Sequence, residues 1–224
     1  WFPGPDGADP GVCARHRAGP SSRGAAMFMQ VIQGHVRDAD GLRQAADQWR
    51  RELQPGATGF LGSTSGVTPD GMGVVVARFA DEESARRNSD RPEQSAWWEK
   101  TSKMFDSDVS FIDCPDCDVM MGGGSDDAHF VQLIECKVKD REAMRGAGRE
   151  MEVDLRESRP DIVGGIIGWH GDEMVQVMYF TDEEHARDDA DDSKSRLVNN
   201  WCWRWQWLGS AMFPGPAAHN VCFT

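Results

Sequence analysis

Two short stretches, Phe28-Met-Gln-Val-Ile32 and Phe130-Val-Gln-Leu-Ile134, open two copies of one pattern at a spacing of 102 residues. Without a gap, 8 of the 26 residues in 28–53 recur in 130–155. A second matching pair, Phe79-Ala-Asp-Glu-Glu-Ser-Ala-Arg86 and Phe180-Thr-Asp-Glu-Glu-His-Ala-Arg187, follows in the same order at a spacing of 101. A hairpin loop of different length absorbs the slip of one residue. The chain is therefore predicted to contain an internal repeat.

Each copy begins with a predicted strand and a predicted helix. Residues 28–37 and 130–139 are apolar and β-branched, as strands are. The next segment of each copy has apolar residues at the spacing of an amphipathic helix packed on one face. In copy one these are Leu42, Ala45, Ala46, Trp49 and Leu53, and in copy two Met144, Ala147, Gly148, Met151 and Leu155.

The second half of each copy predicts two strands and another helix. The strands are expected at 58–63 and 72–79 in copy one, and at 162–169 and 174–180 in copy two, with turns at 68–71 and 170–173. The second helix is expected to begin at Asp81 and at Thr181, where Thr181 and Glu184 form a capping box. In copy one it breaks near Pro92 and resumes through Phe105, before a fourth strand at Val109–Asp113.

The order β-α-β-β-α-β predicts an α+β fold of two tandem ferredoxin-like modules, 27–121 and 129–197, joined by a Gly/Ser/Asp linker at 122–128. Residues 1–26 lack a periodic apolar face and are interpreted as a disordered or non-native extension. The tail 198–224 is Trp-rich and diverges from copy one, as does the end of the second helix. Module 2 needs a fourth strand, which the spacing of 101 puts at Ser210–Pro214. The alternating tryptophans of 201–207 are a second candidate, although poor order of 199–208 is the favoured interpretation.

Composition excludes several classes of function. The net charge of −13 disfavours binding to nucleic acid or to an anionic membrane, because both require a basic surface. No stretch approaches the roughly 20 apolar residues that span a bilayer, and a cytoplasmic location is expected. The six cysteines are too few and too irregular for a disulfide framework. Cys114-Pro-Asp-Cys117 has the spacing of a redox pair or half a zinc site, but it follows a strand and lacks a second pair, so free thiols are favoured.

The opening strands, the two Phe-to-Arg junctions and the Trp97-Trp98 pair resemble the dimeric α+β barrel superfamily, and within it the antibiotic-biosynthesis-monooxygenase-like domains. The resemblance covers residues 27–195. It implies that two modules close one intramolecular barrel, so that the chain is a monomer with a pseudo-dimeric barrel. The family includes cofactor-independent monooxygenases, haem-degrading enzymes and proteins of unknown role, and it has no shared catalytic signature.

The candidate ligand-binding residues are polar or aromatic side chains near the expected cleft between sheet and helices: Gln30, Gln132, His35, Trp49, Trp97, Trp98 and Trp169. Gln30 and Gln132 are polar residues on strands expected to be buried, where an amide needs partners in the protein or in a ligand. The tryptophans form either an aromatic pocket or ordinary core. No metal site is predicted and catalytic residues are not identified.

Three functions remain open at this point. The resemblance favours a small-molecule-binding protein that acts as a monooxygenase without cofactor or metal. A polycyclic phenol would bind in an apolar cleft, lose a proton to give a carbanion and react directly with oxygen. The expected partner is therefore a small apolar or aromatic ligand. The alternatives are a non-catalytic binding or stress-related module and a haem-binding or haem-degrading protein. An open cleft near Gln30 or Gln132 favours the first, complete packing favours the second, and a histidine beside an open pocket would favour the third.

Overall fold

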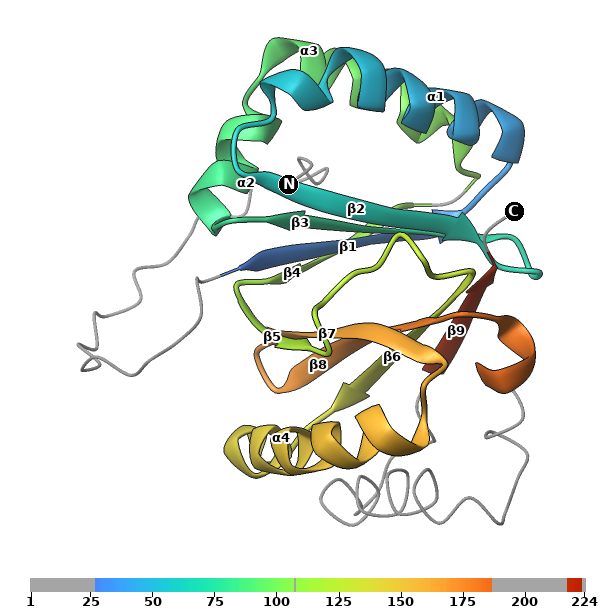
Figure 1. Cartoon of the computed structure of the whole chain (residues 1–224). Coiled ribbons are helices and arrows are strands. Elements are labelled where there is room, and N and C mark those ends of the chain that lie inside the picture. The colour runs from blue at the N-terminus through green and yellow to red at the C-terminus, as the bar shows by residue number, and fades with distance from the viewer. Residues whose placement is uncertain (1–26, 107, 187–216, 223–224) are drawn as a thin grey trace.

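The structure is a computed structural model that describes residues 27–106 and 108–186, together with the backbone of 217–222. Statements below refer to these residues. Figure 1 shows helices on one side, two halves of one sheet that face each other in the middle, and a long helix on the opposite side.

Module 1 contains four strands with helices on one side of their sheet (Figure 1). Its elements in chain order are β1 (Phe28–His35), α1 (Ala39–Glu52), the 3₁₀ turn Gln54–Gly56, β2 (Phe60–Val67), β3 (Met72–Phe79), α2 (Glu82–Ser89), α3 (Pro92–Thr101), the 3₁₀ turn Ser102–Met104 and β4 (Ser110–Cys114). Asp38 and Asp81 cap α1 and α2 by accepting backbone N–H groups, and Pro92 opens α3.

Module 2 repeats this order with a single long helix in its described part. Its elements are β6 (Phe130–Lys137), α4 (Arg141–Ser158), β7 (Ile162–His170), β8 (Glu173–Phe180) and β9 (Ala217–Cys222). Residues 183–186 start a further helix. Between the modules, β5 (Asp116–Met120) follows β4 after the single residue Pro115.

All strands belong to one sheet in the order β4-β1-β3-β2-β9-β6-β8-β7-β5. The first four strands and the group β9-β6-β8-β7 have the same internal order, with β9 at the place that β4 has in module 1. Both β2 and β7 shift register at the same point, between Phe60 and Gly62 and between Ile162 and Gly164. The tandem ferredoxin-like arrangement is thereby confirmed, down to a shared irregularity.

Two strands link the modules: β5 crosses from module 1 to module 2, and β9 of module 2 meets the edge of module 1. β5 leaves β4 and pairs with β7, while β9 pairs with β6 and meets β2 at Val67 and Cys222. The barrel interior is an apolar core contributed by both sheets: Met29, Val31, Val74, Val76, Cys114, Val131, Leu133, Ile166, Val175, Val177 and Tyr179. Burial of this shared core holds the modules together.

Two polar links cross the barrel interior. The Gln33 amide donates to the Glu135 carboxylate, and the hydroxyls of Thr64 and Tyr179 lie 2.9 Å apart. Gln33 and Glu135 occupy equivalent positions of the two repeats, so an amide in one module pairs with a carboxylate in the other. Two carboxylates at that point would repel each other.

Several expected boundaries are corrected by the structure. β2 ends at Val67 rather than Ser63, because Ser63–Val67 continue the ladder with β3. β5 was not expected at all. Asp182, not Thr181, caps the second helix of module 2, since its carboxylate accepts the His185 N–H at 2.8 Å. The fourth strand of module 2 is β9, beyond both expected segments, which lie outside the described residues together with 1–26.

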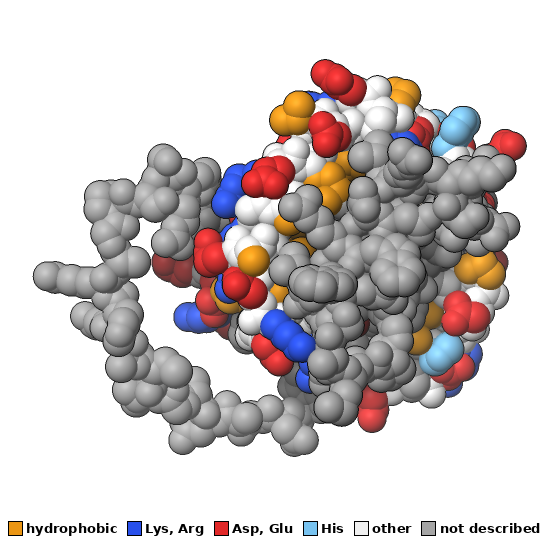
Figure 2. Space-filling view, turned by 90° about the horizontal axis from the view of Figure 1, so that it is seen from below, with side chains coloured by type: hydrophobic (Ala, Val, Ile, Leu, Met, Phe, Trp, Pro, Cys, Tyr) orange, Lys and Arg blue, Asp and Glu red, His pale blue; other side chains and the backbone are white. Residues whose placement is uncertain are grey.

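No helix in the described part of the chain is long and apolar enough to cross a membrane. Figure 2 shows the face of the molecule seen from below Figure 1. There, acidic and basic side chains are interspersed over the described surface, with hydrophobic side chains between them.

Candidate functional site

A cavity of about 370 Å³ lies between the module 1 sheet and helices α1 and α3. Its walls are mainly apolar and aromatic. The lining residues include Leu42, Ala46, Trp49, Phe60, Ser63, Ser65, Val67, Val75, Ala77, Phe79, Trp97 and Trp98, and the charged residues Arg43, Asp47 and Arg50. A concave, mostly apolar site with a few polar groups is typical of a small-molecule pocket.

Hydrogen bonds within the protein hold the aromatic wall in place. The Trp49 indole N–H donates to the Gln94 side-chain oxygen at 2.6 Å, and the Trp97 N–H donates to the Ala45 carbonyl at 3.0 Å. Phe60 packs edge-on against Trp49, with ring centroids 4.9 Å apart. Because both indole donors are already used, Trp49 and Trp97 offer a ligand their apolar ring surfaces rather than hydrogen bonds.

Small side chains on the sheet side leave the space open. Ser63 and Ser65 of β2 and Ala77 of β3 line the cavity from below the helices. Each serine hydroxyl is able to donate one hydrogen bond and to accept others. The charged residues lie on α1, where Asp47 forms a surface ion pair with Arg50 at 3.2 Å. The site therefore combines apolar walls with the two serine hydroxyls of β2 and one charged helix edge.

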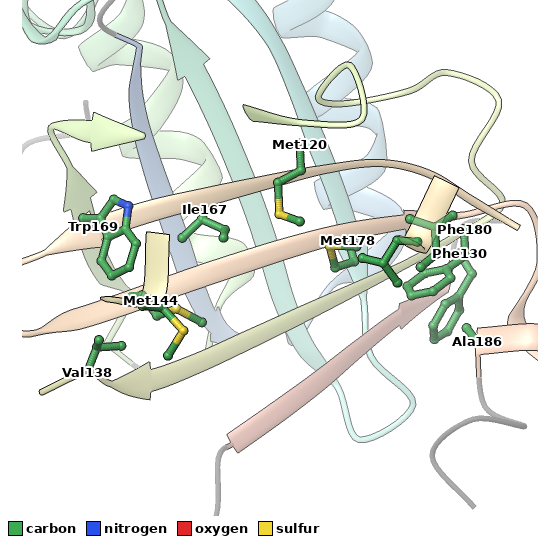
Figure 3. Close-up of a cluster of buried hydrophobic side chains, with 12 residues drawn as sticks. Met120, Phe130, Val138, Met144, Ile167, Trp169, Met178, Phe180 and Ala186 are labelled. Atoms are coloured by element: carbon green, nitrogen blue, oxygen red, sulfur yellow. The ribbon is translucent and has the colours of Figure 1, made fainter. Parts of the chain in front are cut away.

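The same layer of module 2 is filled. Strand register matches Val67 to Trp169, Ser65 to Ile167 and Ala77 to Met178, so a larger side chain stands at each of these positions. Figure 3 shows Ile167, Trp169 and Met178 in the cluster that packs on this side of the module 2 sheet. All three are nearly inaccessible to solvent. Close packing of this kind leaves no room for a ligand at these positions.

Charged residues close the module 2 layer at its edge. The Arg145 guanidinium donates to Asp118 at 2.7 Å and to Asp116 at 2.8 Å, and the Trp169 N–H donates to Asp118 at 2.6 Å. Arg141 and Arg145 lie over the Trp169 ring, 4.8 and 5.3 Å from its centroid. Both carboxylates come from β5, the strand that crosses from module 1.

The structure brings three of the sequence-predicted residues to the cavity and leaves Trp169 outside it. Trp49, Trp97 and Trp98 line the pocket. Trp98 also packs against Phe105 and Phe111. Trp169 belongs to module 2, where it fills the equivalent space instead of bordering it.

The predicted polar residues are not among the lining residues. Gln30 is buried, and its amide N–H donates to Asp113 at 2.6 Å, while its carbonyl oxygen has no partner among the described residues. Gln132 lies half-buried on β6. His35 is exposed at the end of β1. Burial raises the pKa of the Asp113 carboxyl, an effect that the hydrogen bond from Gln30 partly opposes.

The two cysteines of the Cys-x-x-Cys segment lie where β4 runs into β5, with Cys114 in the barrel core. Both are free thiols. Burial raises the pKa of Cys114 to about 12 and also raises that of Cys117. A thiol with a raised pKa carries little of the thiolate that redox chemistry requires. No cluster of His, Cys, Asp or Glu suited to a metal ion occurs within the described ranges.

Sequence inspection missed the small residues that make the cavity, Ser63, Ser65 and Ala77, and the charged edge of α1. A signal for Ser65 and Ala77 was present in the repeat, because module 2 has Ile167 and Met178 there, whereas Ser63 corresponds to Gly165. Where two copies of a module hold serine against isoleucine or alanine against methionine at one position, the difference in volume points to open space in one copy. Aromatic content alone gave only the walls.

No protein-family model and no curated protein sequence matches the chain. Similar folds occur among solved structures. Two are described as "putative monooxygenase": one from Fusobacterium nucleatum (TM-score 0.67, 10% identity, 88% of this chain and 92% of that chain) and one from Lactobacillus acidophilus (TM-score 0.63, 15% identity, 88% and 93%). An anthrone oxidase-like protein also matches (TM-score 0.62, 9% identity, 88% and 91%). At such low identity the likeness concerns the fold alone, and it confirms the predicted fold, an α+β barrel of two ferredoxin-like modules in tandem.

Proposed function

We propose that module 1 binds a small aromatic molecule in its cavity and that the protein acts on it as a cofactor-independent monooxygenase. The observation that carries the proposal is the open volume of about 370 Å³ under α1 and α3, at positions that module 2 fills with larger side chains. The descriptions of the structural neighbours as monooxygenases and as anthrone oxidase-like support the reaction class by analogy.

The pocket suits a planar ligand of two or three fused rings. Trp49, Trp97 and Phe60 would stack on the rings, and the Ser63 and Ser65 hydroxyls would bond to ring oxygens. Among the lining residues, Asp47 has the only carboxylate, and we assign it the role of proton acceptor. An anthrone-type substrate would lose a proton from its central CH₂ carbon to Asp47. The resulting carbanion would add O₂ to give a peroxide anion, which takes the proton back from Asp47 and becomes a hydroperoxide. Loss of water then leaves a new carbonyl, so that one oxygen atom enters the product and the other leaves as water.

Oxygen consumption tests this proposal. The purified full chain, treated with a chelator and given no cofactor, is expected to speed O₂ uptake by anthrone and the appearance of anthraquinone above the rate without protein. A filled-pocket variant (Ser65→Ile, Val67→Trp and Ala77→Met) carries the module 2 residues and is expected to lose this activity. Leu61→Trp is the matched control, because Leu61 lies on the same strand with its side chain 53% exposed. A filled-pocket variant as active as the wild type would refute the location of the site.

Non-catalytic binding is the second candidate, and one observation favours it. The Asp47 carboxylate is 46% exposed and paired with Arg50, so it is not held in the dry environment that raises the basicity of catalytic carboxylates. In that case the protein would bind the aromatic probe and leave the rate of O₂ uptake unchanged. The haem alternative receives no support at this pocket, because none of its lining residues is a histidine.

We also propose that the protein is a monomer, because β5 and β9 close within one chain the seams that single-module proteins would close between two subunits. Sedimentation velocity tests this directly. A single species near the chain mass of 24.9 kDa is expected, and a concentration-independent dimer would contradict it. The cytoplasmic location remains a prediction from the sequence.

A further inference from the structure

The internal repeat gives one charged residue of the pocket a structural template. Arg43 on α1 and Arg145 on α4 occupy the same position of the two copies, at the spacing of 102. Arg43 lines the module 1 cavity. Arg145 lies at the corresponding edge of module 2, where side chains of the protein surround its guanidinium. What Arg145 binds therefore indicates what an arginine at this place on the helix is able to reach.

Arg145 binds carboxylates. Its Nε and one terminal nitrogen donate to Asp118 and Asp116 at 2.7 and 2.8 Å, and its side chain is only 14% exposed. The Trp169 ring lies beneath the guanidinium. Arg145 thus donates two hydrogen bonds to carboxylate oxygens and stacks on an aromatic ring. In this geometry a planar guanidinium binds a carboxylate better than the ammonium group of a lysine does.

The strand that meets β2 at this edge of module 1 differs in sequence from β5. The carboxylates of module 2 come from β5, which pairs with β7, whereas the strand that meets β2 is β9. Its sequence, Ala-Ala-His-Asn-Val-Cys, contains no Asp or Glu. Arg43 pairs with Asp40, 2.7 Å away and three residues earlier on the same helix, and both side chains are mostly exposed, at 62% and 84%. Such surface ion pairs contribute little to the stability of the fold, so a ligand carboxylate readily replaces Asp40 as the partner of Arg43.

The neighbouring charges do not supply a substitute. Asp47, the carboxylate that lines the cavity, is paired with Arg50 at 3.2 Å. Arg50 thus has its partner within the cavity, whereas Arg43 is the lining cation whose partner, Asp40, lies outside it. The Val67 side chain stands where module 2 has Trp169, so the space under the Arg43 side of the helix is open to a ligand ring.

We propose that Arg43 binds the carboxylate of an aromatic acid, which takes the place that Asp116 and Asp118 hold beside Arg145, while the ring of the ligand takes the place of Trp169. The proposal deepens the proposed function and rests on it, because it needs an aromatic ligand in the module 1 cavity. It names the substrate class as an aromatic carboxylic acid.

Calorimetric titration with two probes of the same shape tests the proposal: 2-naphthoate, which is an anion at pH 7, and 2-naphthamide, which is neutral. The wild-type protein is expected to bind the acid at least about tenfold more tightly, which corresponds to about 1.4 kcal/mol. Arg43→Gln should remove this preference and leave amide binding unchanged. Arg51→Gln, an exposed residue of the same helix outside the pocket, should retain the preference and serves as the matched control.

Each outcome is decisive. Equal binding of acid and amide to the wild type overturns the role of Arg43 and leaves the aromatic pocket standing. A preference that survives in Arg43→Gln also overturns it, because the anion then binds elsewhere. If neither probe binds the wild type, the proposed function fails, and the role of Arg43 fails with it. Because Arg43 is exposed, the variant is expected to fold, and its melting temperature checks this.

Discussion

Modules 1 and 2 share a strand order, a bulge and a helix stripe, yet they use the space between sheet and helix in opposite ways. In module 1 small side chains such as Ser65 and Ala77 leave a cavity below Trp49 and Trp97. In module 2 the equivalent positions hold Ile167 and Met178, which pack against α4. The backbone of the repeat is thus compatible with either a pocket or a core, and a few side-chain volumes decide between them.

The two modules are also expected to contribute differently to stability and to ligand binding. Module 2 contributes a filled hydrophobic layer and supplies half of the barrel core. In module 1, part of the equivalent layer is an open cavity instead of packed side chains. A cavity forgoes the packing contacts that would otherwise stabilise the fold, so we expect module 2 to account for more of the stability and module 1 for any binding.

The largest expected effect comes from giving module 2 the residue of module 1. Trp169→Val replaces a large side chain that is 2% exposed with a small one and thereby creates a cavity within a packed cluster. By analogy with large-to-small core substitutions, it should lower the free energy of unfolding by about 3–5 kcal/mol. Val67→Ala at the equivalent, half-buried position of the pocket should cost about 1 kcal/mol or less. Urea denaturation measures both, and equal losses would show that the two layers are packed alike.

A smaller effect is expected from the contact that joins the modules. Tyr179→Phe removes the hydroxyl that lies 2.9 Å from Thr64 across the barrel, and a single hydrogen bond of this kind contributes about 1 kcal/mol. A double-mutant cycle with Thr64→Val isolates the pair. A coupling energy near zero would mean that the modules are held together by the apolar core alone.

The smallest effect concerns a titratable difference between the modules. In strand register Gln30 faces Asp113 in module 1, and Gln132 faces Asn220 in module 2. Burial raises the pKa of Asp113 above its ordinary value of 3.8. The folded chain therefore binds the Asp113 proton more tightly than the unfolded chain does. As the pH rises above 3.8 the proton is lost more readily from the unfolded chain, so the free energy of unfolding falls.

Asp113→Asn, the module 2 residue, keeps an acceptor for Gln30 and removes the charge. It should raise the free energy of unfolding at pH 7 by a small amount, and the difference from the wild type should shrink towards pH 4. Urea denaturation at both pH values measures it. A variant less stable than the wild type at pH 7 would show that the charged form of Asp113 is favoured in the fold.

Most of the architecture could be predicted from the sequence, because strands such as β1 and β6 and the stripe of α1 have strong local patterns. β5 could not, since Asp116 and Asp118 alternate with Cys117 and Val119 in a segment that becomes a strand only through pairing with β7 in the other module. The serine-rich end of β2 was missed because serine and glycine give little local strand signal, and these residues become a strand through their ladder with β3. The pocket was predicted only in its aromatic walls, because open volume depends on residues that are small rather than on residues that stand out.

The central claim is that one chain holds one aromatic site, in module 1. Calorimetric titration of the full chain with 2-naphthol, a neutral two-ring probe, counts the sites directly. The account predicts one site per chain in the wild type and a loss of affinity of at least about tenfold, or about 1.4 kcal/mol, in the filled-pocket variant. Two equivalent sites per chain, or one site that survives unchanged in the filled-pocket variant, would contradict it.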